Sequence, residues 1–384
     1  MFQRVYNAAT SRLAAGRDRY LCRTRTRLLH GPAKVDLGDT QMMVTLLTRN
    51  AAWYMPTFLD HHFSIGAAHV LVIDNGSTDE TVEICRRYDR VTVLSNTLPV
   101  ARYESILRRQ LSRRVARGGW VLFADSDELT DPPDQSATAM ADLMRYGNAH
   151  GYTAFTGHVI DYFSLRPYAE ISGLGYADAV EALDHYSLEQ LDFIPYADPD
   201  RIPFKWFLRH NRCVHPEIGF RRGGIRRELF DENPFLTRHS LVRNSKDIDL
   251  MVHPHCASNV NVGDVTMLVR HYKFAGDWIS RERATLQARI WRHHEGVARM
   301  NTVGNAAGYR FEPAAPRRWM GTDRLVEEGF LKCPRHYRDF VAASPGHSGT
   351  KVGAQSGDEV PVRRNAAAVQ PRPGSGPSPR SVAS

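Results

Sequence analysis

Two stretches of the chain decide its fold: HVLVIDNGSTDET at residues 69–81 and WVLFADSDEL at residues 120–129. Each starts with a run of apolar residues, which is the pattern of a buried strand, and passes directly into polar and acidic residues. An Asn-Gly turn follows the first strand, and Ser77 with Glu80 has the spacing of a capping box that opens a helix. A strand, a turn and a helix in this order are typical of one unit of a parallel α/β sheet.

The same alternation extends to both sides of these stretches. Residues 42–48 (MMVTLLT) predict an earlier strand, and a helix with Pro56 near its first turn follows it. Residues 91–94 predict another strand, and a further helix is expected to stop at Gly118-Gly119. The apolar stripe of that helix consists of Tyr103, Ile106, Leu107, Leu111 and Val115. Four strands with helices between them predict a parallel sheet with right-handed crossovers.

The remaining segments differ in composition and divide the chain into four regions. Residues 1–38 form a basic N-terminal extension that is partly helical, and residues 39–275 hold the α/β domain. Within that domain the part after residue 150 is less periodic, which favours mixed strands and long loops. Residues 276–344 predict a C-terminal helical segment. Residues 345–384 contain no Phe, Trp or Tyr, so we expect that tail to be disordered.

The formal net charge of +8 belongs to the two ends of the chain. Residues 1–38 carry eight Lys and Arg against two acids, and residues 345–384 carry five against two, which leaves about −1 for residues 39–344. A nucleic-acid-binding domain usually concentrates its positive charge on the folded body. The distribution therefore argues against a nucleic-acid partner.

The sequence contains neither a membrane-spanning segment nor a secretory signal. No run approaches the roughly 20 apolar residues that cross a bilayer, and the N-terminus lacks the compact apolar segment of a secretory signal. The five cysteines are scattered and odd in number, which fits a reducing cytosol. In residues 1–15 apolar residues recur at helical spacing beside arginines. This pattern has two interpretations: a helix docked on the protein itself, or peripheral contact of residues 1–30 with the inner face of the membrane.

The carboxylates of Asp125 and Asp127 follow the strand at residues 120–124 and are the first candidates for chemistry. Ligands of open parallel sheets bind beyond the carboxyl ends of the strands. Two acids at this spacing can offer hard oxygen ligands to Mg²⁺ or Mn²⁺, which would bridge the protein to diphosphate oxygens. The alternative is a polar strand end that caps a helix or faces water. The position after an apolar strand of a βαβ array favours the ligand interpretation.

Asp74 ends the strand at residues 69–74 and can accept a hydrogen bond from a nucleotide base or a ribose hydroxyl. The same segment has turn chemistry, because its Asn-Gly pair supplies a positive φ and Ser77 can cap a helix. We expect both interpretations to hold. The residues after Asp74 are then structural, and Asp74 itself contacts the ligand.

The chain resembles the glycosyltransferase family 2-like proteins of the GT-A fold in three consecutive segments: TLLTRN (45–50), HVLVIDNGSTDET (69–81) and WVLFADSDEL (120–129). Two later segments, GGIRRELF (223–230) and LVRHYKF (268–274), resemble blocks of the bacterial subgroup called "glycosyl transferase family 2, type 4". The resemblance implies a GT-A-type, Rossmann-like, mostly parallel sheet flanked by helices. A mixed acceptor-side half and a C-terminal helical extension are expected to complete the fold.

The resemblance further implies metal-dependent transfer of a sugar from a nucleotide-diphospho-sugar donor to a glycan or other acceptor, in the biosynthesis of a cell-surface polysaccharide. It implies that Asp74 lies near the base, that Asp125 lies near the ribose or the metal, and that Asp127 of the DXD motif is a metal ligand. Thr48 and Asn50 belong to the same donor-binding edge. The implied metal is Mn²⁺ or Mg²⁺.

A late histidine often completes the metal or diphosphate site of GT-A enzymes, and His271 in HYKF is the candidate in this chain. A neutral imidazole suits Mn²⁺ better than Mg²⁺, while the alternative is a satisfied histidine at a strand edge. His253 and His255 are rival candidates. Arg226 follows a Gly-Gly pair and is expected to reach the diphosphate, against the alternative of a solvated basic turn.

Family 2 enzymes typically invert the anomeric carbon with the help of a carboxylate base, and Asp161 in GHVIDYF is the candidate, against an ordinary solvated acid. One departure is Ala51, since the subgroup usually has an acid after the preceding Asn. Ala51 favours an alternative function, a non-catalytic degenerate GT-A module that binds a glycan or a protein partner. A second alternative is a nucleotidyltransferase, which usually has a Gly-rich basic signature where this chain has Thr48-Arg49-Asn50.

Overall fold

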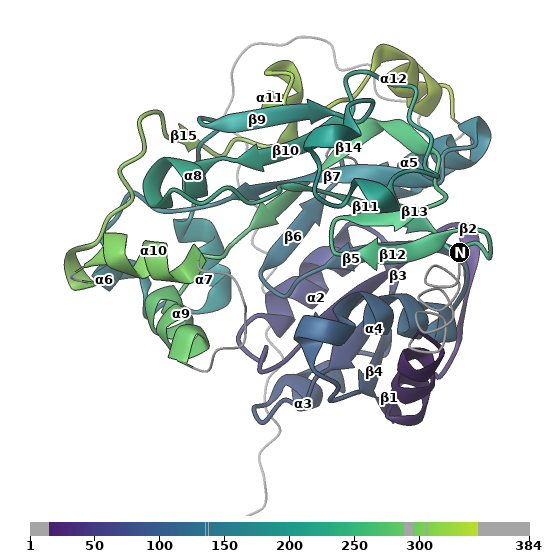
Figure 1. Ribbon diagram of the computed structural model, residues 1–384, viewed down its shortest axis with the longest axis horizontal. Coiled ribbons are helices and arrows are strands. Elements are labelled where there is room, and N and C mark those ends of the chain that lie inside the picture. The colour runs from purple at the N-terminus through teal and green to yellow at the C-terminus, as the bar shows by residue number, and fades with distance from the viewer. Residues whose placement is uncertain (1–14, 135, 137, 288–294, 305, 345–384) are drawn as a thin grey trace, which may run out of the picture.

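A computed structural model describes residues 15–134, 136, 138–287, 295–304 and 306–344 (Figure 1). The described residues form one large sheet with the strand order β1-β4-β3-β2-β5-β11-β7-β14-β6. Its strands are β1 (Arg27–His30), β2 (Val35–Thr48), β3 (Ala67–Asp74), β4 (Val91–Ser95), β5 (Ala116–Ala124), β6 (Glu128–Asp131), β7 (Ala154–Asp161), β11 (Thr237–Arg243) and β14 (Val262–His271).

Most strands of this sheet point in one direction. β4, β3, β2 and β5 form consecutive parallel pairs, and β7 pairs with β14 in parallel. β11 lies between β5 and β7 and is antiparallel to both, so the two parallel groups share their direction. β1 and β6 are antiparallel strands at the two edges. The predicted α/β class with a mostly parallel sheet flanked by helices is confirmed.

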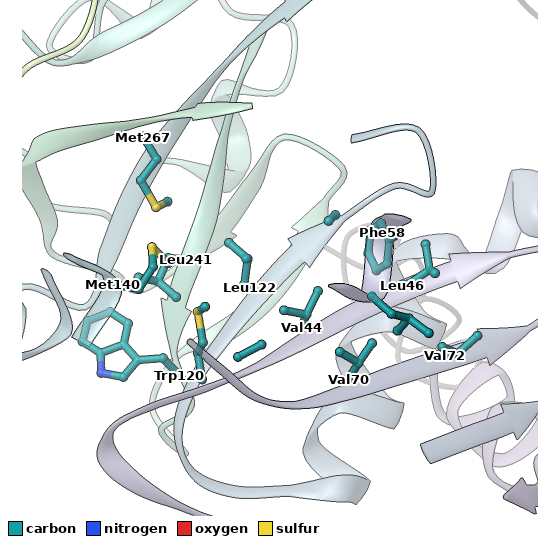
Figure 2. Close-up of a cluster of buried hydrophobic side chains, with 14 of the residues drawn as sticks. Val44, Leu46, Phe58, Val70, Val72, Trp120, Leu122, Met140, Leu241 and Met267 are labelled. Carbon is teal, nitrogen blue, oxygen red and sulfur yellow. The ribbon is translucent and has the colours of Figure 1, made fainter. Parts of the chain in front are cut away.

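Helices cover both faces of the parallel half of the sheet, as the double-sided burial of β2 requires. Val44 and Leu46 pack with Phe58 in one core (Figure 2), whereas Met43 packs with Leu107 in another. Successive side chains of a strand point to opposite faces, so an unbroken apolar run is typical of a strand buried on both sides. The helices of this half are α2 (Met55–Ser64), α3 (Thr81–Cys85), α4 (Val100–Val115) and α5 (Ala139–His150).

The elements after β7 add a mixed half and a C-terminal part. They are α6 (Tyr168–Ile171), α7 (Tyr176–Ala182), β8 (His185–Tyr186), β9 (Leu191–Pro195), η1 (Pro199–Arg201), η2 (Lys205–Phe207), β10 (Gly219–Gly223), α8 (Ile225–Phe230), β12 (Asp249–His253), β13 (Cys256–Ser258), α9 (Trp278–Gln287), α10 (Glu295–Val303), η3 (Ala306–Gly308), β15 (Arg317–Arg318), α11 (Thr322–Glu327) and α12 (Arg335–Ala342). α12 returns to the sheet: Tyr337 is 1% exposed in the same core as Val44. His336 Nε2 lies 2.6 Å from the buried carboxylate of Asp264, which also accepts the hydroxyl of Tyr146. The C-terminal part is therefore packed against the body of the domain.

Two boundaries differ from the sequence-based predictions. β2 begins at Val35 and β1 pairs with β4, so residues 27–30 and 35–38 are part of the sheet and do not belong to a separate extension. Gly118-Gly119 lies inside β5, because α4 has already ended at Val115. Both glycines have a positive φ (+71° and +61°), and a Cβ on Gly119 would lie 2.5 Å from the Cβ of Leu37. The pair therefore allows β5 to approach β2 closely.

Some predictions concern residues outside the described part. The disorder expected for residues 345–384 lies outside it, and so does most of the amphipathic pattern at residues 1–15, while residues 15–24 are helical. In the ranges that the structure describes, no helix is both long and apolar enough to span a bilayer. All five cysteines are described and are free thiols.

Candidate functional site

The polar residues singled out in the sequence meet at one edge of the sheet, where β2, β3 and β5 end. Strand register places Thr48 beside Asp74 and Leu46 beside Ala124, so Asp125 lies close to the level of Asp74 on the other side of β2. Neighbouring strands lie about 4.8 Å apart, so two strand spacings separate Asp74 and Asp125 by roughly 10 Å. This is the edge at which parallel α/β sheets bind ligands.

The turn after β3 is held by Asp74 and Asn50. Asp74 is 3% exposed, and its carboxylate accepts the backbone N–H groups of Gly76 at 3.2 Å and Ser77 at 3.0 Å. Asn50 has a left-handed backbone (φ +54°), and its N–H donates to the hydroxyl of Ser77 at 2.9 Å. Its side-chain carbonyl accepts the N–H of Thr78 at 2.8 Å. Thr48, Asn50 and Asp74 are thus brought together, with the carboxylate of Asp74 engaged by its own turn.

The capping box predicted from Ser77 to Glu80 is wrong, because α3 begins without a side-chain cap. Asp79 organises this corner instead: its carboxylate accepts the N–H groups of Thr81 and Ala52, both at 3.0 Å. Burial would raise the pKa of Asp79, but these hydrogen bonds outweigh it and lower the pKa. No role was predicted for Asp79, since its contact with Ala52 crosses between two loops.

Ala51 lies directly beneath this corner. It is 1% exposed within the hydrophobic core, and its N–H donates to the hydroxyl of Thr81 at 2.8 Å. The position that the resemblance associates with an acid is therefore a buried apolar one in this chain. Asp79, whose carboxylate accepts the N–H of Ala52, is the acid that stands next to it.

Asp125 is fixed by two arginines. Arg108 of α4 and Arg238 of β11 both donate to its carboxylate, Arg238 at 3.4 Å, and the side chain of Asp125 is 42% exposed. Burial would raise the pKa of Asp125, but the two guanidinium groups outweigh it and hold the pKa below its usual range. Arg238 also donates to Glu128, which accepts the N–H of Asp125 at 2.8 Å and is 4% exposed. The result is an ionised, partly exposed carboxylate whose position is set by buried charges.

Asp127 and His271 form the start of a second polar chain. The Nε2 atom of His271 lies 3.3 Å from Oδ2 of Asp127, whose side chain is 26% exposed. The Nδ1 atom of His271 lies 2.5 Å from Oδ1 of Asp161, and Nε of Arg226 donates to Oδ2 of Asp161 at 2.8 Å. Burial would lower the pKa of His271, but the two carboxylates outweigh it and raise the pKa to about 9. His271 therefore links an accessible carboxylate to a buried one.

The same contacts bear on Asp161, predicted as the base, and on Arg226, predicted to reach the diphosphate. Asp161 is 1% exposed by its side chain and both of its oxygens are engaged, so it does not fit the role of a base that meets an acceptor hydroxyl. Although burial would raise its pKa, Arg226 and His271 hold the pKa of Asp161 far below its usual range. Arg226 is 9% exposed and forms an ion pair with Asp161. It is therefore not part of a solvated basic turn, which was the alternative to diphosphate binding. Asp161 is a positioning residue for His271.

The residues present fit a divalent cation in chemistry. Metal-binding histidines characteristically donate their second ring N–H to a carboxylate, which is the arrangement of Asp161 and His271, and the other ring nitrogen then faces the metal. Here that nitrogen faces the carboxylate of Asp127, which offers a hard oxygen ligand. Among the described residues, however, no group of three or more His, Cys, Asp or Glu side chains is closely enough arranged to hold a metal. Asp127 and His271 would thus be two protein ligands, with oxygens of the substrate or water completing the shell.

A pocket of about 530 Å³ opens beside these groups. Asp125, Arg226 and His271 line it, and so do His253 and His255, which stack against Phe204. Arg108, Arg238 and Glu128 also line the pocket and were missed in the sequence analysis. One signal was available for Arg238, since a charge inside the strand TRHSLVR requires a buried partner.

Comparisons with known proteins agree with the sequence resemblance. Residues 48–212 match the family model "Glycosyl transferase family 2". Among solved structures, TarS of S. aureus is 21% identical with a TM-score of 0.23, and the match covers 32% of this chain and 22% of TarS. A UDP-glucose pyrophosphorylase complexed with UDP-glucose is 5% identical with a TM-score of 0.17, over 38% of this chain and 66% of that one. Both similarities are too distant to bear on function, and no curated protein matches the chain in sequence.

Proposed function

We propose that this chain, whose residues 48–212 match the glycosyl transferase family 2 model, is a glycosyltransferase that transfers a sugar from a nucleotide-diphospho-sugar donor to a glycan acceptor with the help of a divalent cation. One observation carries the proposal: Asp125 and the Asp127–His271 pair lie together at the carboxyl end of β5, beside a pocket. An exposed acid pair at this edge suits a nucleotide diphosphate and its cation.

The donor lies along the edge formed by Thr48, Asn50, Asp74 and Asp125 in this proposal. The hydrogen bonds of Asn50 to the turn after β3 keep that edge rigid before the donor arrives. Arg108 and Arg238 keep Asp125 ionised and in place, ready to accept a ribose hydroxyl or to contact the cation. Preorganised side chains of this kind need no rearrangement when the substrate binds.

Asp127 and His271 would hold Mn²⁺ or Mg²⁺, with Mn²⁺ favoured by the imidazole. The bound cation would supply positive charge that neutralises the leaving nucleoside diphosphate. Asp161 contributes indirectly, since it accepts a hydrogen bond from Nδ1–H of His271 and so fixes the ring with Nε2 toward Asp127. Arg226 balances the charge of Asp161 inside the protein.

We also propose inversion at the anomeric carbon, with a carboxylate other than Asp161 as the base. The test is the anomeric configuration of the first product, followed by proton NMR during transfer. A product that keeps the configuration of the donor would contradict this part of the proposal. The biosynthesis of a cell-surface polysaccharide is the process in which we place the reaction.

Thermal unfolding tests the donor and metal together. We expect UDP or GDP to raise the melting temperature of the full chain in the presence of Mn²⁺ and to leave it unchanged after chelation with EDTA. Asp127→Ala is expected to lose this shift entirely. Asp192→Asn, which removes an acid paired with arginines away from the pocket, is the matched control and is expected to keep it.

Two outcomes would favour the alternatives. If neither nucleotide shifts the melting temperature with Mn²⁺ present, the non-catalytic binding module, favoured by the buried Ala51, becomes the better account. If the chain forms a nucleoside triphosphate from a nucleotide sugar and pyrophosphate, it is a nucleotidyltransferase. Metal-dependent hydrolysis within a panel of nucleotide sugars would identify the donor.

Peripheral membrane contact through residues 1–30 is a further part of the proposal. Arg19, Arg23 and Arg25 are exposed and form no ion pair with any described residue, and Tyr20 beside them is 66% exposed. Such a basic surface suits anionic lipid. The full chain is expected to float with phosphatidylglycerol vesicles and not with phosphatidylcholine vesicles. Equal recovery with both would contradict the contact.

A further inference from the structure

The pocket beside the candidate site has an aromatic wall that the donor and metal do not explain. The ring of Phe204 stacks on His253 at 4.5 Å and 17° and lies 5.4 Å from His255 at 14°. Burial lowers the pKa of His255 to about 3, so its ring is neutral at neutral pH. Pro203, Pro234 and Pro254 also line the pocket. The pocket is therefore lined in part by stacked rings and proline side chains.

The aromatic surface continues from the wall to the outside of the protein. The ring of Phe207, in the short η2 turn, stacks on His253 at 5.9 Å and 29°, and Phe207 is 41% exposed. Trp206, in the same turn, is 70% exposed. Large aromatic side chains are seldom left in water in such proximity without a binding role. The turn thus forms an exposed rim to the aromatic wall.

Charged groups line the same pocket. Glu104, Asp125 and Glu128 supply carboxylates, and Arg108 and Arg238 supply guanidinium groups. An acyl chain would leave these groups without water, which is unfavourable. A highly charged ligand would gain nothing from the stacked rings. A ligand that suits both the rings and the charged groups has apolar C–H faces together with many hydroxyl groups, and a pyranose ring has both.

We propose that the aromatic wall of Phe204, His253 and His255 is the acceptor subsite and that the acceptor is an oligosaccharide. Its terminal sugar enters the pocket toward Asp125, and the preceding sugar lies on the rim formed by Trp206 and Phe207. This inference rests on the proposed transfer function, because it takes Asp125 to mark the donor side. The inference identifies the acceptor by the C–H faces and hydroxyl groups of its sugar rings. It excludes a lipid or a protein side chain as the group that the aromatic wall binds.

Binding to an array of immobilised di- to hexasaccharides, measured with the labelled full chain, tests the inference. The wild type is expected to bind at least one oligosaccharide, and Phe207→Ala and Trp206→Ala are each expected to bind it at least fivefold more weakly. Both residues are exposed, so their replacement leaves the folded body intact. Tyr20→Ala removes an aromatic side chain that is 66% exposed elsewhere and is expected to bind as the wild type does.

The melting-temperature shift caused by UDP or GDP with Mn²⁺, measured on the same proteins, separates the two proposals. An unchanged shift with weakened saccharide binding supports both of them. Saccharide binding that depends on Phe207, without any nucleotide shift, supports the aromatic wall as a glycan site and contradicts the transfer function. Wild-type binding to no saccharide, or equal binding by the Phe207 and Trp206 variants, overturns the acceptor inference even where the nucleotide shift is present.

Discussion

Asp161→Asn isolates the buried charge on which the geometry of His271 depends. The substitution keeps the shape of the side chain and removes its charge. Arg226 and His271 then lose the carboxylate that accepts one N–H group from each of them. Removal of one partner from a buried ion pair costs about 3 kcal/mol or more, because the other charge is left buried without compensation. Asp161 is 1% exposed, so solvent screening does not reduce this cost.

We therefore expect the melting temperature of Asp161→Asn, measured by differential scanning fluorimetry without metal, to fall by at least about 5 °C. Asp192→Asn is the matched control, because Asp192 is also paired with two arginines but is 37% exposed. An exposed pair contributes at most about 1 kcal/mol, so the control should melt close to the wild type. Arg226→Met in the Asp161→Asn background should recover part of the lost stability. A variant that melts within 1 °C of the wild type and still transfers sugar would refute the positioning role of Asp161.

Three other outcomes follow from the described contacts. Arg238→Met should lower the free energy of unfolding in urea by about 3 kcal/mol, because Glu128 keeps a buried charge without its partner, and the additional change Glu128→Gln should restore part of it. Burial lowers the pKa of His62 and His239 to about 3, below the value of 6.5 in the unfolded chain, so the unfolded state binds more protons and stability falls as the pH drops below 6.5. At pH 5.5 each histidine should lower the free energy of unfolding by about 1.4 kcal/mol relative to pH 7.5. Equal free energies of unfolding in urea at the two pH values would contradict this. Trp120→Ala should destabilise the chain by about 3 to 5 kcal/mol in the same assay, since Trp120 is fully buried, and a smaller loss would mean that the core collapses into the space.

The sequence predicted those features that depend on local pattern. The apolar run at 42–48 corresponds to a strand buried on both faces, and the acids Asp125 and Asp127 do follow a strand of the parallel array. The helix stripe with Leu107 and Leu111 is buried against the sheet. Each of these properties needs only the period of the chain and the identity of the next few residues.

Features that depend on contacts between distant segments were not predictable in the same way. β11 enters the sheet between β5 and β7, and only this insertion brings Arg238 to Asp125. The burial of Asp161 results from packing against β14 and α8, so the sequence could not distinguish a buried positioning acid from a solvated one. Ser77 was assigned to a cap because the spacing to Glu80 is right, but its hydroxyl instead accepts the N–H of Asn50 in the loop after β2.

The central place of β11 also has a consequence during synthesis. Its residues leave the ribosome 113 positions after the end of β5 (from Ala124 to Thr237), which takes roughly 6 to 23 s at translation rates of about 5 to 20 residues per second. Throughout that interval β5 is an open edge with a row of unpaired amide and carbonyl groups, able to pair with the same strand of another nascent chain. The chain is thus exposed to self-association on polysomes, and a trigger-factor-like or Hsp70-like holdase that covers this edge would be expected to raise its yield.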